Sequence, residues 1–267
     1  MNILLTNDDS VESKGIWILR ELLIDAGHKV FLVAPAIERS AASHSITIRE
    51  PLRVKKVQNP FNKKDFTESA FSVSGTPVDC VILAFEEILK NEPKIDLVIS
   101  GINAGQNLGD DMLYSGTVAA AIEAMCFGYK AIALSNTSFE NQKYEVAAEI
   151  MCNLVKHNIS QFIGHREILN INVPNVDKNE IKSTRITQVG FRRYQNILHK
   201  DKDHRNRDIF WIGGDNPIYE KSDFCLDYEA IKNNEVSISP VKVDFSNKDK
   251  IDSLKNWLSN IGEMDEI

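Results

Sequence analysis

Strand-like and helix-like segments alternate along the first 173 residues, and this alternation most limits the folds open to the chain. In residues 15–26, for example, Ile16, Leu19, Leu22 and Leu23 have the spacing of one helix face. Strand-like runs lie at 2–6, 29–34, 71–74, 95–100, 130–135 and 168–173, and helix-like segments lie at 15–26, from a cap at Ser74 or Thr76 onward, at 115–126 and at 142–158. Alternation of this kind predicts an α/β fold with a doubly wound, mostly parallel sheet.

The alternation of strand-like and helix-like segments ends at about residue 181. Short β-like runs at 184–190, 209–212 and 236–243 are broken by a charged stretch at 199–208, and a last helix is expected at 248–261. We therefore expect an α/β catalytic domain, a β-rich arm that packs on a partner subunit, and a terminal helix with a tail. Their bounds are 1–190, 191–247 and 248–267.

Composition narrows the class of protein. A length of 267 residues suits one large α/β domain with an appendage, and no apolar run approaches the roughly 20 residues that span a bilayer. The start does not resemble a signal peptide, so a cytoplasmic protein without a membrane partner is expected. A net charge of −7 argues against binding a nucleic-acid polymer. Four cysteines lack metal-ligand spacing and are expected to be buried free thiols: Cys80, Cys126, Cys152 and Cys225.

Polar residues follow three of the expected strands. Asp8 and Asp9 come directly after the first, Ser40 lies in the loop after the second, and Asn103 lies in the long stretch 101–114. Ligands in open α/β sheets bind at the carboxyl ends of the strands, near the point where the strand order reverses. Loops longer than the usual 2 to 6 residues at this edge are often functional.

Asp8 and Asp9 are adjacent carboxylates with no basic residue beside them. A solvated turn or a helix cap is one explanation, and a divalent cation that neutralises the pair is the other, which the loop lengths favour. Because the nearby candidates are carboxylate, hydroxyl and amide oxygens, Mg²⁺ or Mn²⁺ fits better than zinc.

The segment YSGT at 114–117 opens an Ala-rich helix. Free backbone N–H groups at a helix start, together with the hydroxyls of Ser115 and Thr117, make a favourable place for a phosphate. An ordinary helix cap explains the same residues. His44, in a Ser-rich loop, is expected to be structural rather than a substrate contact.

Several ordered motifs make the chain similar to the survival protein E nucleotidases, metal-dependent phosphatases of nucleoside monophosphates. The resemblance is carried by ILLTNDDS, VAPAIERSAASHSIT, SVSGTPVDCV, DLVISGINAGQNLGDDMLYSGTVAAAIEA and NINVPN, and more loosely by ITQVGFRRY, WIGG and AIKNNEVSISPV. It implies a Rossmann-like domain whose C-terminal arm is exchanged between subunits of a homodimer or homotetramer. It also implies one divalent cation bound by Asp8, Asp9, Ser40 and Asn103, with Asn107, Ser115, Gly116 and Thr117 around the phosphate.

The chain departs from the family pattern at four positions. Ser10 and Ala41 stand where the family usually has glycine, and Val11 and Lys14 stand where it has an aromatic residue and a proline. If the backbone at Ser10 must take a positive φ, the strain costs roughly 1 kcal/mol.

The expected reaction is in-line attack of a cation-activated water on a nucleoside 5′-monophosphate, with 3′-monophosphates and short polyphosphate as further substrates. Asp8 is expected to be a direct ligand, and Asp9 a ligand or a proton acceptor. One alternative is an aspartyl-phosphate phosphatase of the haloacid dehalogenase type, although that family separates its two aspartates by one residue. Another is a receiver module that binds Mg²⁺ without catalysis. No G-x-G-x-x-G follows the first strand, which argues against a nicotinamide site.

Overall fold

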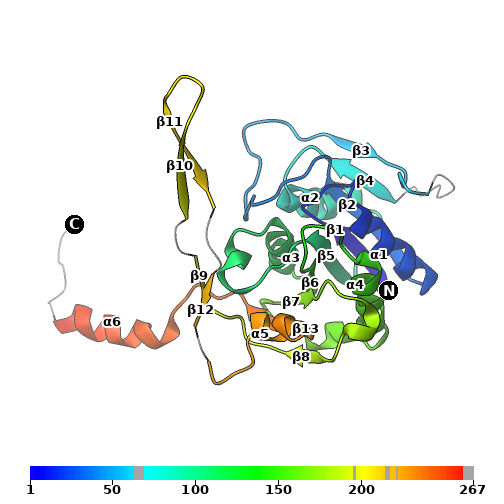
Figure 1. The fold of residues 1–267 in the computed structure, drawn as a ribbon. Coiled ribbons are helices and arrows are strands. Elements are labelled where there is room, and N and C mark those ends of the chain that lie inside the picture. Colours follow the sequence, from blue (N-terminus) through cyan, green and yellow to red (C-terminus); the bar gives the residue numbers. More distant parts are fainter. Residues whose placement is uncertain (63–68, 195–196, 214–216, 221, 261–267) are drawn as a thin grey trace.

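A nine-stranded sheet forms the centre of the molecule, with strand order β3-β4-β2-β1-β5-β6-β7-β13-β8. The structure is a computed structural model that describes residues 1–62, 69–194, 197–213, 217–220 and 222–260 (Figure 1). Neighbouring strands from β4 to β7 are parallel, while β3 and β13 run antiparallel to β4 and β7. The α/β class with a mostly parallel sheet is therefore confirmed. The strands of this sheet are β1 (Asn2–Thr6), β2 (Lys29–Pro35), β3 (Val54–Lys56), β4 (Ala70–Val73), β5 (Leu97–Ala104), β6 (Ala131–Asn136), β7 (Glu167–Val173), β8 (Thr184–Ile186) and β13 (Val236–Lys242).

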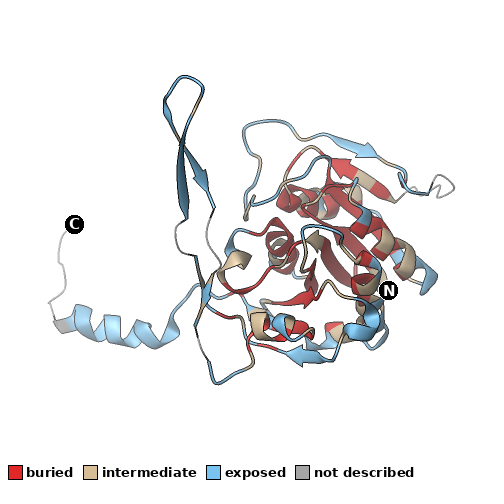
Figure 2. Ribbon diagram, viewed as in Figure 1, coloured by how far each residue is buried: buried red, intermediate tan, exposed pale blue. Residues whose placement is uncertain are grey.

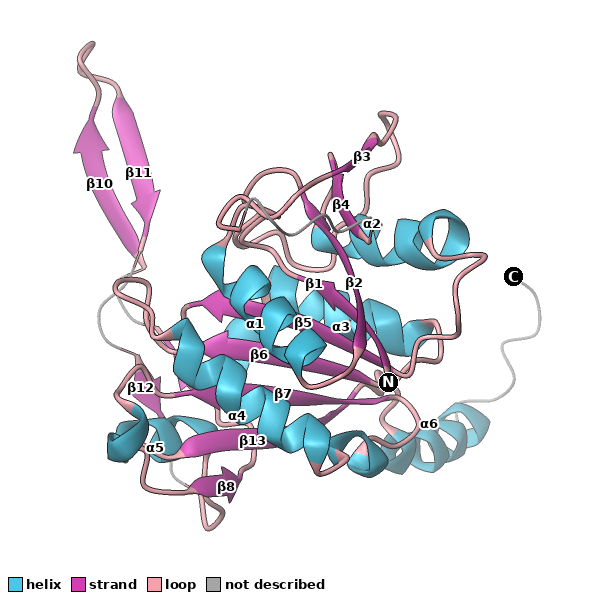
Figure 3. Ribbon diagram, turned by 90° about the vertical axis from the view of Figure 1, so that its right-hand side faces the viewer, coloured by secondary structure: helices cyan, strands magenta, loops and turns pink. Residues whose placement is uncertain are grey.

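Helices cover both faces of the sheet, because alternate side chains of its buried strands point to opposite sides. Ile3 and Leu5 of β1 pack with α1 (Lys14–Asp25) and α4 (Tyr144–Lys156), the pair that crosses the sheet in Figure 3. On the other face Leu4 packs with α2 (Pro77–Leu83), its π-helical continuation η1 (Ala84–Ile88), and α3 (Gly116–Cys126). Two apolar cores result, one on each side of the sheet.

The strand order reverses between β1 and β5. From β1 the chain builds outward through β2 and β4 on one side, and from β5 through β6 and β7 on the other. The carboxyl ends of β1 and β5 therefore open next to each other at the switch point of the sheet, where α/β proteins bind ligands.

Strand β5 is longer than the sequence pattern predicted. It runs on through Ala104, with a register shift between Ser100 and Asn103 where it pairs with β6. Asn103 therefore lies inside the strand and not in a loop after it, which corrects the expected fourteen-residue loop. A portion of the remainder is the 3₁₀ helix η2 (Gly109–Leu113). The Gly- and Asn-rich composition hid the irregular end of the strand.

The charged stretch 199–208, which was expected to interrupt the β-like runs, lies mostly in a hairpin of β10 (Leu198–Lys202) and β11 (Asp208–Ile212). This hairpin stands away from the body, as does α6 (Lys248–Asn260), and both are exposed where the sheet and its helices are buried (Figure 2). The short strands β9 (Arg192–Arg193) and β12 (Ile218–Tyr219) pair at the base of the hairpin. The other short helices are η3 (Ile159–Phe162), η4 (Lys178–Glu180) and α5 (Asp227–Lys232).

Strand β13 returns the C-terminal region of the chain to the main sheet, between β7 and β8. Residues 195–196, 214–216 and 221 of the expected arm lie outside the described residues, as does the expected tail at 261–267. Within the described ranges, no helix has the length and apolar character needed to cross a membrane. The four cysteines are free as expected, but of these only Cys80 is buried, whereas Cys126 is exposed and Cys152 and Cys225 are partly buried.

Candidate functional site

Asp8 follows β1 and lies against the amino end of α3. The residue is 4% exposed, and its carboxylate accepts the backbone N–H of Thr117 at 3.1 Å and the Thr117 hydroxyl in a short hydrogen bond. Gly116 permits this approach, because a Cβ there would lie 2.9 Å from the Cβ of Asp8. Burial raises the pKa of Asp8, and the hydrogen bonds from Thr117 and Gly116 oppose that rise. The helix start therefore faces a carboxylate of the chain itself.

Asp9 lies on the other side of the switch point, against β5. Its Oδ2 accepts the backbone N–H of Ala104 at 2.8 Å. Burial raises the pKa of Asp9 to about 7, and the charges of Asp8 and Glu38 act in the same direction. Among the described residues, no Lys, Arg or His side chain forms an ion pair with either Asp8 or Asp9. Two adjacent, largely buried carboxylates thus share one place without a positive side chain.

Asn103 lies beside this pair. Its Nδ2 donates to the carbonyl of Gly105 at 2.8 Å, which fixes the amide and leaves Oδ1 as its acceptor atom. Because Asn103 directly precedes Ala104, which donates to Asp9, the amide and the carboxylate belong to one short stretch of contacts.

Ser40 reaches the site less directly. The backbone N–H of Arg39 donates to the carbonyl of Asp8 at 2.8 Å, which holds the 38–43 loop beside the pair. The Ser40 hydroxyl itself donates to Glu38 Oε1 at 2.5 Å. Among the residues that the structure describes, its side chain makes no hydrogen bond to Asp8, Asp9 or Asn103.

The donor set fits a hard divalent cation. Two carboxylates, an amide oxygen and a hydroxyl are the ligand types that Mg²⁺ and Mn²⁺ prefer. The raised pKa values of the two carboxylates have burial as the main cause, and a bound cation would favour the charged forms. No group of three or more His, Cys, Asp and Glu side chains converges among the described residues, so the neutral oxygens of Asn103 and Ser40 would be needed to complete a site.

The residues expected around the phosphate make different contacts in the structure. Ser115 caps α3, its hydroxyl accepting the backbone N–H of Val118 at 3.1 Å, which is the ordinary role that the sequence left open. Gly116 and Thr117 hold Asp8. Asn107 is 5% exposed, and its Nδ2 donates to the hydroxyl of Ser135 at 2.8 Å. The structure thus brings these residues to the switch point, and their contact with phosphate stays a prediction.

Two residues that sequence reasoning had not singled out hold Asn107 in place. Asn172 accepts its backbone N–H at 2.8 Å and donates to its carbonyl at 3.0 Å, and Asn170 donates to the same carbonyl at 2.8 Å. Both lie on β7 and are fully buried. The alternation of asparagine with isoleucine and valine in NINV was the available signal, because a buried asparagine requires partners.

His44 has a structural partner, as expected. Its Nε2 lies 2.7 Å from Glu123 of α3. Together with the Ser43 hydroxyl, which donates to the carbonyl of Leu113 at 2.7 Å, this contact ties the 38–47 loop to the region that precedes α3.

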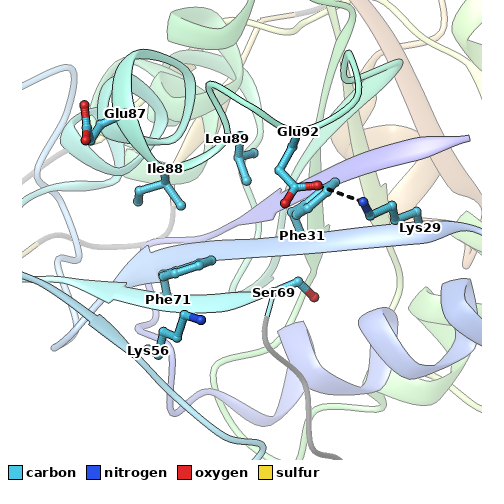
Figure 4. A pocket seen from close by; sticks show the side chains of 9 residues that line it. All are labelled: Lys29, Phe31, Lys56, Ser69, Phe71, Glu87, Ile88, Leu89 and Glu92. Atoms are coloured by element: carbon cyan, nitrogen blue, oxygen red, sulfur yellow. Dashed lines mark hydrogen bonds and ion pairs between the residues drawn. The ribbon is translucent and has the colours of Figure 1, made fainter.

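A separate pocket of 600 Å³ lies at the amino ends of the parallel strands, on the opposite side from the switch-point site (Figure 4). It is lined by Lys29 and Phe31 near the amino end of β2 and by Phe71 of β4, and Glu92 pairs with Lys29 at 2.8 Å across it. Since β1 is parallel to β2, this pocket is remote from Asp8, which follows the carboxyl end of β1.

Comparison with known proteins gives consistent results along nearly the whole chain. The model of the family described as survival protein SurE matches residues 3–196. The 5′-nucleotidase SurE of Natranaerobius thermophilus is 41% identical over 261 residues, which cover 96% of this chain and 98% of that protein. The 5′/3′-nucleotidase SurE of Wigglesworthia glossinidia brevipalpis is 40% identical, with 97% and 98% covered.

A solved structure agrees with these relatives. The SurE protein from Aquifex aeolicus superposes with a TM-score of 0.82 at 35% sequence identity, covering 96% of this chain and 99% of that one.

Proposed function

This chain belongs to the survival protein SurE family, and on that premise we propose that it is a divalent-cation-dependent phosphatase of nucleoside monophosphates. The 5′-nucleotidase activity named for its relatives supports the reaction, and the relative named a 5′/3′-nucleotidase supports 3′-monophosphates as further substrates. Short polyphosphate is a third proposed substrate. The observation that carries the proposal is the carboxylate pair at the switch point of the sheet, where Asp8 is buried and Asp9 is partly buried. Within the described residues, neither carboxylate forms an ion pair with a cationic side chain.

Residues at different positions of the site would have different roles in the reaction. Asp8, Asp9, Asn103 and Ser40 would hold the cation, with Ser40 exchanging its bond to Glu38 for the metal. When bound, Mg²⁺ or Mn²⁺ supplies a positive charge that polarises the phosphate ester and lowers the pKa of water.

The remaining roles fall to the chain itself. Asp9, which a bound cation would hold in its charged form, is the residue proposed to accept a proton from the attacking water. Asn107 and the segment 115–117 would orient the phosphoryl oxygens as their charge develops.

The alternatives fit the contacts less well. The haloacid dehalogenase type separates its two aspartates by one residue, whereas Asp8 and Asp9 are adjacent in this chain. A receiver module needs an aspartate at the end of its third strand, where β5 carries Ser100, Gly101 and Asn103.

We further propose a cytoplasmic homodimer or homotetramer with exchanged arms, in which the catalytic domain spans residues 1–190, the arm 191–247, and the terminal helix with its tail 248–267. The exposed hairpin β10–β11 and the separate course of α6 support it (Figure 1).

The test is release of inorganic phosphate from nucleoside 5′- and 3′-monophosphates and from short polyphosphate with Mg²⁺, Mn²⁺ or a chelator. We expect cation-dependent release from the monophosphates, abolished in Asp8→Asn and Asp9→Asn, with circular dichroism showing an intact fold. Asp25→Asn, an exposed aspartate at the end of α1, is the matched control and should keep full activity. Full activity of the Asp8 or Asp9 variant would refute the assignment.

A further inference from the structure

A cleft of 360 Å³ opens beside the start of α3. One wall comes from η2 and Tyr114, which directly precedes the cap residue Ser115. The other wall comes from the arm root, which we define as residues 190–194 and 217–220 around β9 and β12. β9 contacts η2, so the two walls belong to one packed unit. The cleft therefore lies next to the segment where the proposed function places the phosphate.

An ion pair in the lining of the cleft leaves little positive charge free. Arg192, whose side chain is 7% exposed, makes a short ion pair with Asp111, and the Tyr194 hydroxyl donates to Asp111 Oδ2 at 2.9 Å. The backbone N–H of Arg192 also donates to Asp110 Oδ2 at 2.9 Å. These bonds hold η2 against the arm root, and Asp111 neutralises the guanidinium charge of Arg192.

Two carboxylates of the lining remain without a cationic partner. Within the described residues, neither Asp110 nor Glu220 forms an ion pair, and Glu220 takes part in hydrogen bonds only through its backbone. A cleft with this charge accepts hydrogen bonds from hydroxyl and amino groups and repels a second phosphate.

Aromatic rings form the rim of the same cleft. Tyr114 is 65% exposed and Phe191 is 64% exposed, and Tyr194 lies beside them. Exposed rings held by a braced backbone are suited to stacking on a planar base, and the carbonyl of Tyr114 is braced by the N–H of Ser43 at 3.1 Å.

We propose that this cleft binds the nucleoside moiety of the substrate, with the base stacked on Phe191 and Tyr114 and the ribose hydroxyls donating to Asp110 and Glu220. The acidic lining sets the orientation, because the phosphate is repelled from the cleft and turned toward Ser115 and the carboxylate pair. Among nucleotides, the site therefore selects those with a single phosphate and discriminates against nucleoside 3′,5′-bisphosphates. This inference rests on the proposed function and assigns its specificity.

The experiment compares adenosine 5′-monophosphate with ribose 5-phosphate, which lacks the base. Phe191→Ala should raise KM for the nucleotide about 5- to 160-fold, the range expected for loss of one stacked base, with kcat little changed. Its kcat/KM for ribose 5-phosphate should stay at the wild-type value. Phe162→Ala is the matched control, since Phe162 is 68% exposed in η3, before the amino end of β7.

The negative charge of Glu220 is tested by a second variant. Glu220→Gln keeps the shape and the backbone bonds of the residue, so it should lower KM for adenosine 3′,5′-bisphosphate several-fold relative to the monophosphate. An unchanged ratio would contradict the repulsion on which the orientation depends.

Two results would contradict the assignment of the base to this cleft. Equal losses on both esters in Phe191→Ala would mean a general structural role for the ring. A selective loss in Phe139→Ala instead would place the base on the opposite rim, because Phe139 is 75% exposed and lies against Gly105. If the wild-type protein released phosphate from neither ester, the proposed function itself would fail, which is a distinct outcome.

Discussion

Ser10 and Ala41 hold backbone conformations that L-residues avoid, with φ of 82° and 54°. We expect Ser10→Gly and Ala41→Gly each to stabilise the protein by up to about 1 kcal/mol, because relief of about 1–2 kcal/mol of left-handed strain exceeds the added entropy of the unfolded chain. The measurement is the free energy of unfolding in urea.

Ala26→Gly is the control for this pair. Ala26 is exposed like Ala41, but its φ is −77°, so glycine relieves no strain there. That variant should lose about 0.4–1 kcal/mol. Equal losses at Ala26 and Ala41 would show that the positive φ carries no strain.

The raised pKa of Asp9 predicts how the stability of the metal-free protein varies with pH. Its pKa is about 7 in the folded chain and near 3.8 when unfolded, so between these values the folded state binds more protons. The contribution of Asp9 to stability is therefore complete below pH 3.8 and is lost as pH rises toward 7.

Thermal unfolding in chelator measures this effect. Across about pH 4 to 7, wild-type Tm should fall relative to that of Asp9→Asn, in which this group no longer titrates, and all other groups are common to both proteins. Parallel curves would contradict the assigned pKa. Added Mg²⁺ or Mn²⁺ should raise wild-type Tm most near the upper end of this range.

The roles of individual site residues could be predicted in part from the sequence. The adjacency of Asp8 and Asp9 and the absence of a nearby base in the sequence indicated a charged ligand. The strain at Ser10 was anticipated as a condition and is present. That Thr117 gives both its N–H and its hydroxyl to Asp8 was not predictable, because the contact joins residues 109 positions apart.

At the scale of elements, β7 is a support for the Asn107 loop as well as a core strand. We expect Asn172→Ala to lower kcat/KM for a nucleoside monophosphate about 10- to 100-fold, because a displaced loop misplaces the phosphoryl group. It should also cost about 1–3 kcal/mol of stability, since the N–H of Asn107 loses its buried acceptor.

The matched control lies directly opposite in the sheet. Ser237 of β13 is the register partner of Asn172 and is equally buried, but its hydroxyl bonds Thr187 at 2.8 Å instead of the loop. Ser237→Ala should lose stability while keeping kcat/KM. A matching loss of activity in both variants would mean that sheet stability, and not the position of Asn107, limits catalysis.

Elements with local signals were the predictable ones. The start of α2 follows from Thr76 and Pro77, and the structure shows the full capping box, with Asp79 Oδ2 accepting the N–H of Thr76 at 2.8 Å. The hairpin in the charged stretch was missed because its strand β10, LHKDK, alternates no apolar face. Its pairing depends on the apolar partner β11, which follows after a short turn.

At the scale of the whole molecule, the hairpin leaves apolar side chains in solvent. Phe210 and Ile212 are 58% and 88% exposed, and Leu198 lies opposite Ile212 on the same face. We expect Phe210→Ser with Ile212→Ser to lower the oligomeric state or the association constant measured by sedimentation. His204→Ser, in the turn of the hairpin, should associate like the wild-type chain. A monomeric wild-type protein would contradict the proposed exchange of arms.

The place of β13 in the sheet has a consequence for synthesis on the ribosome. Strand β7 ends at Val173, but its partner β13 begins only at Val236, so translation at about 5–20 residues per second leaves the growing chain waiting roughly 3 to 13 seconds. During that interval the nascent sheet has an open edge of unpaired N–H and C=O groups, which can recruit a neighbouring polypeptide. Slower decoding between codons 174 and 235 would lengthen this exposure, so synonymous changes there should shift the yield between native protein and aggregate without altering one amino acid.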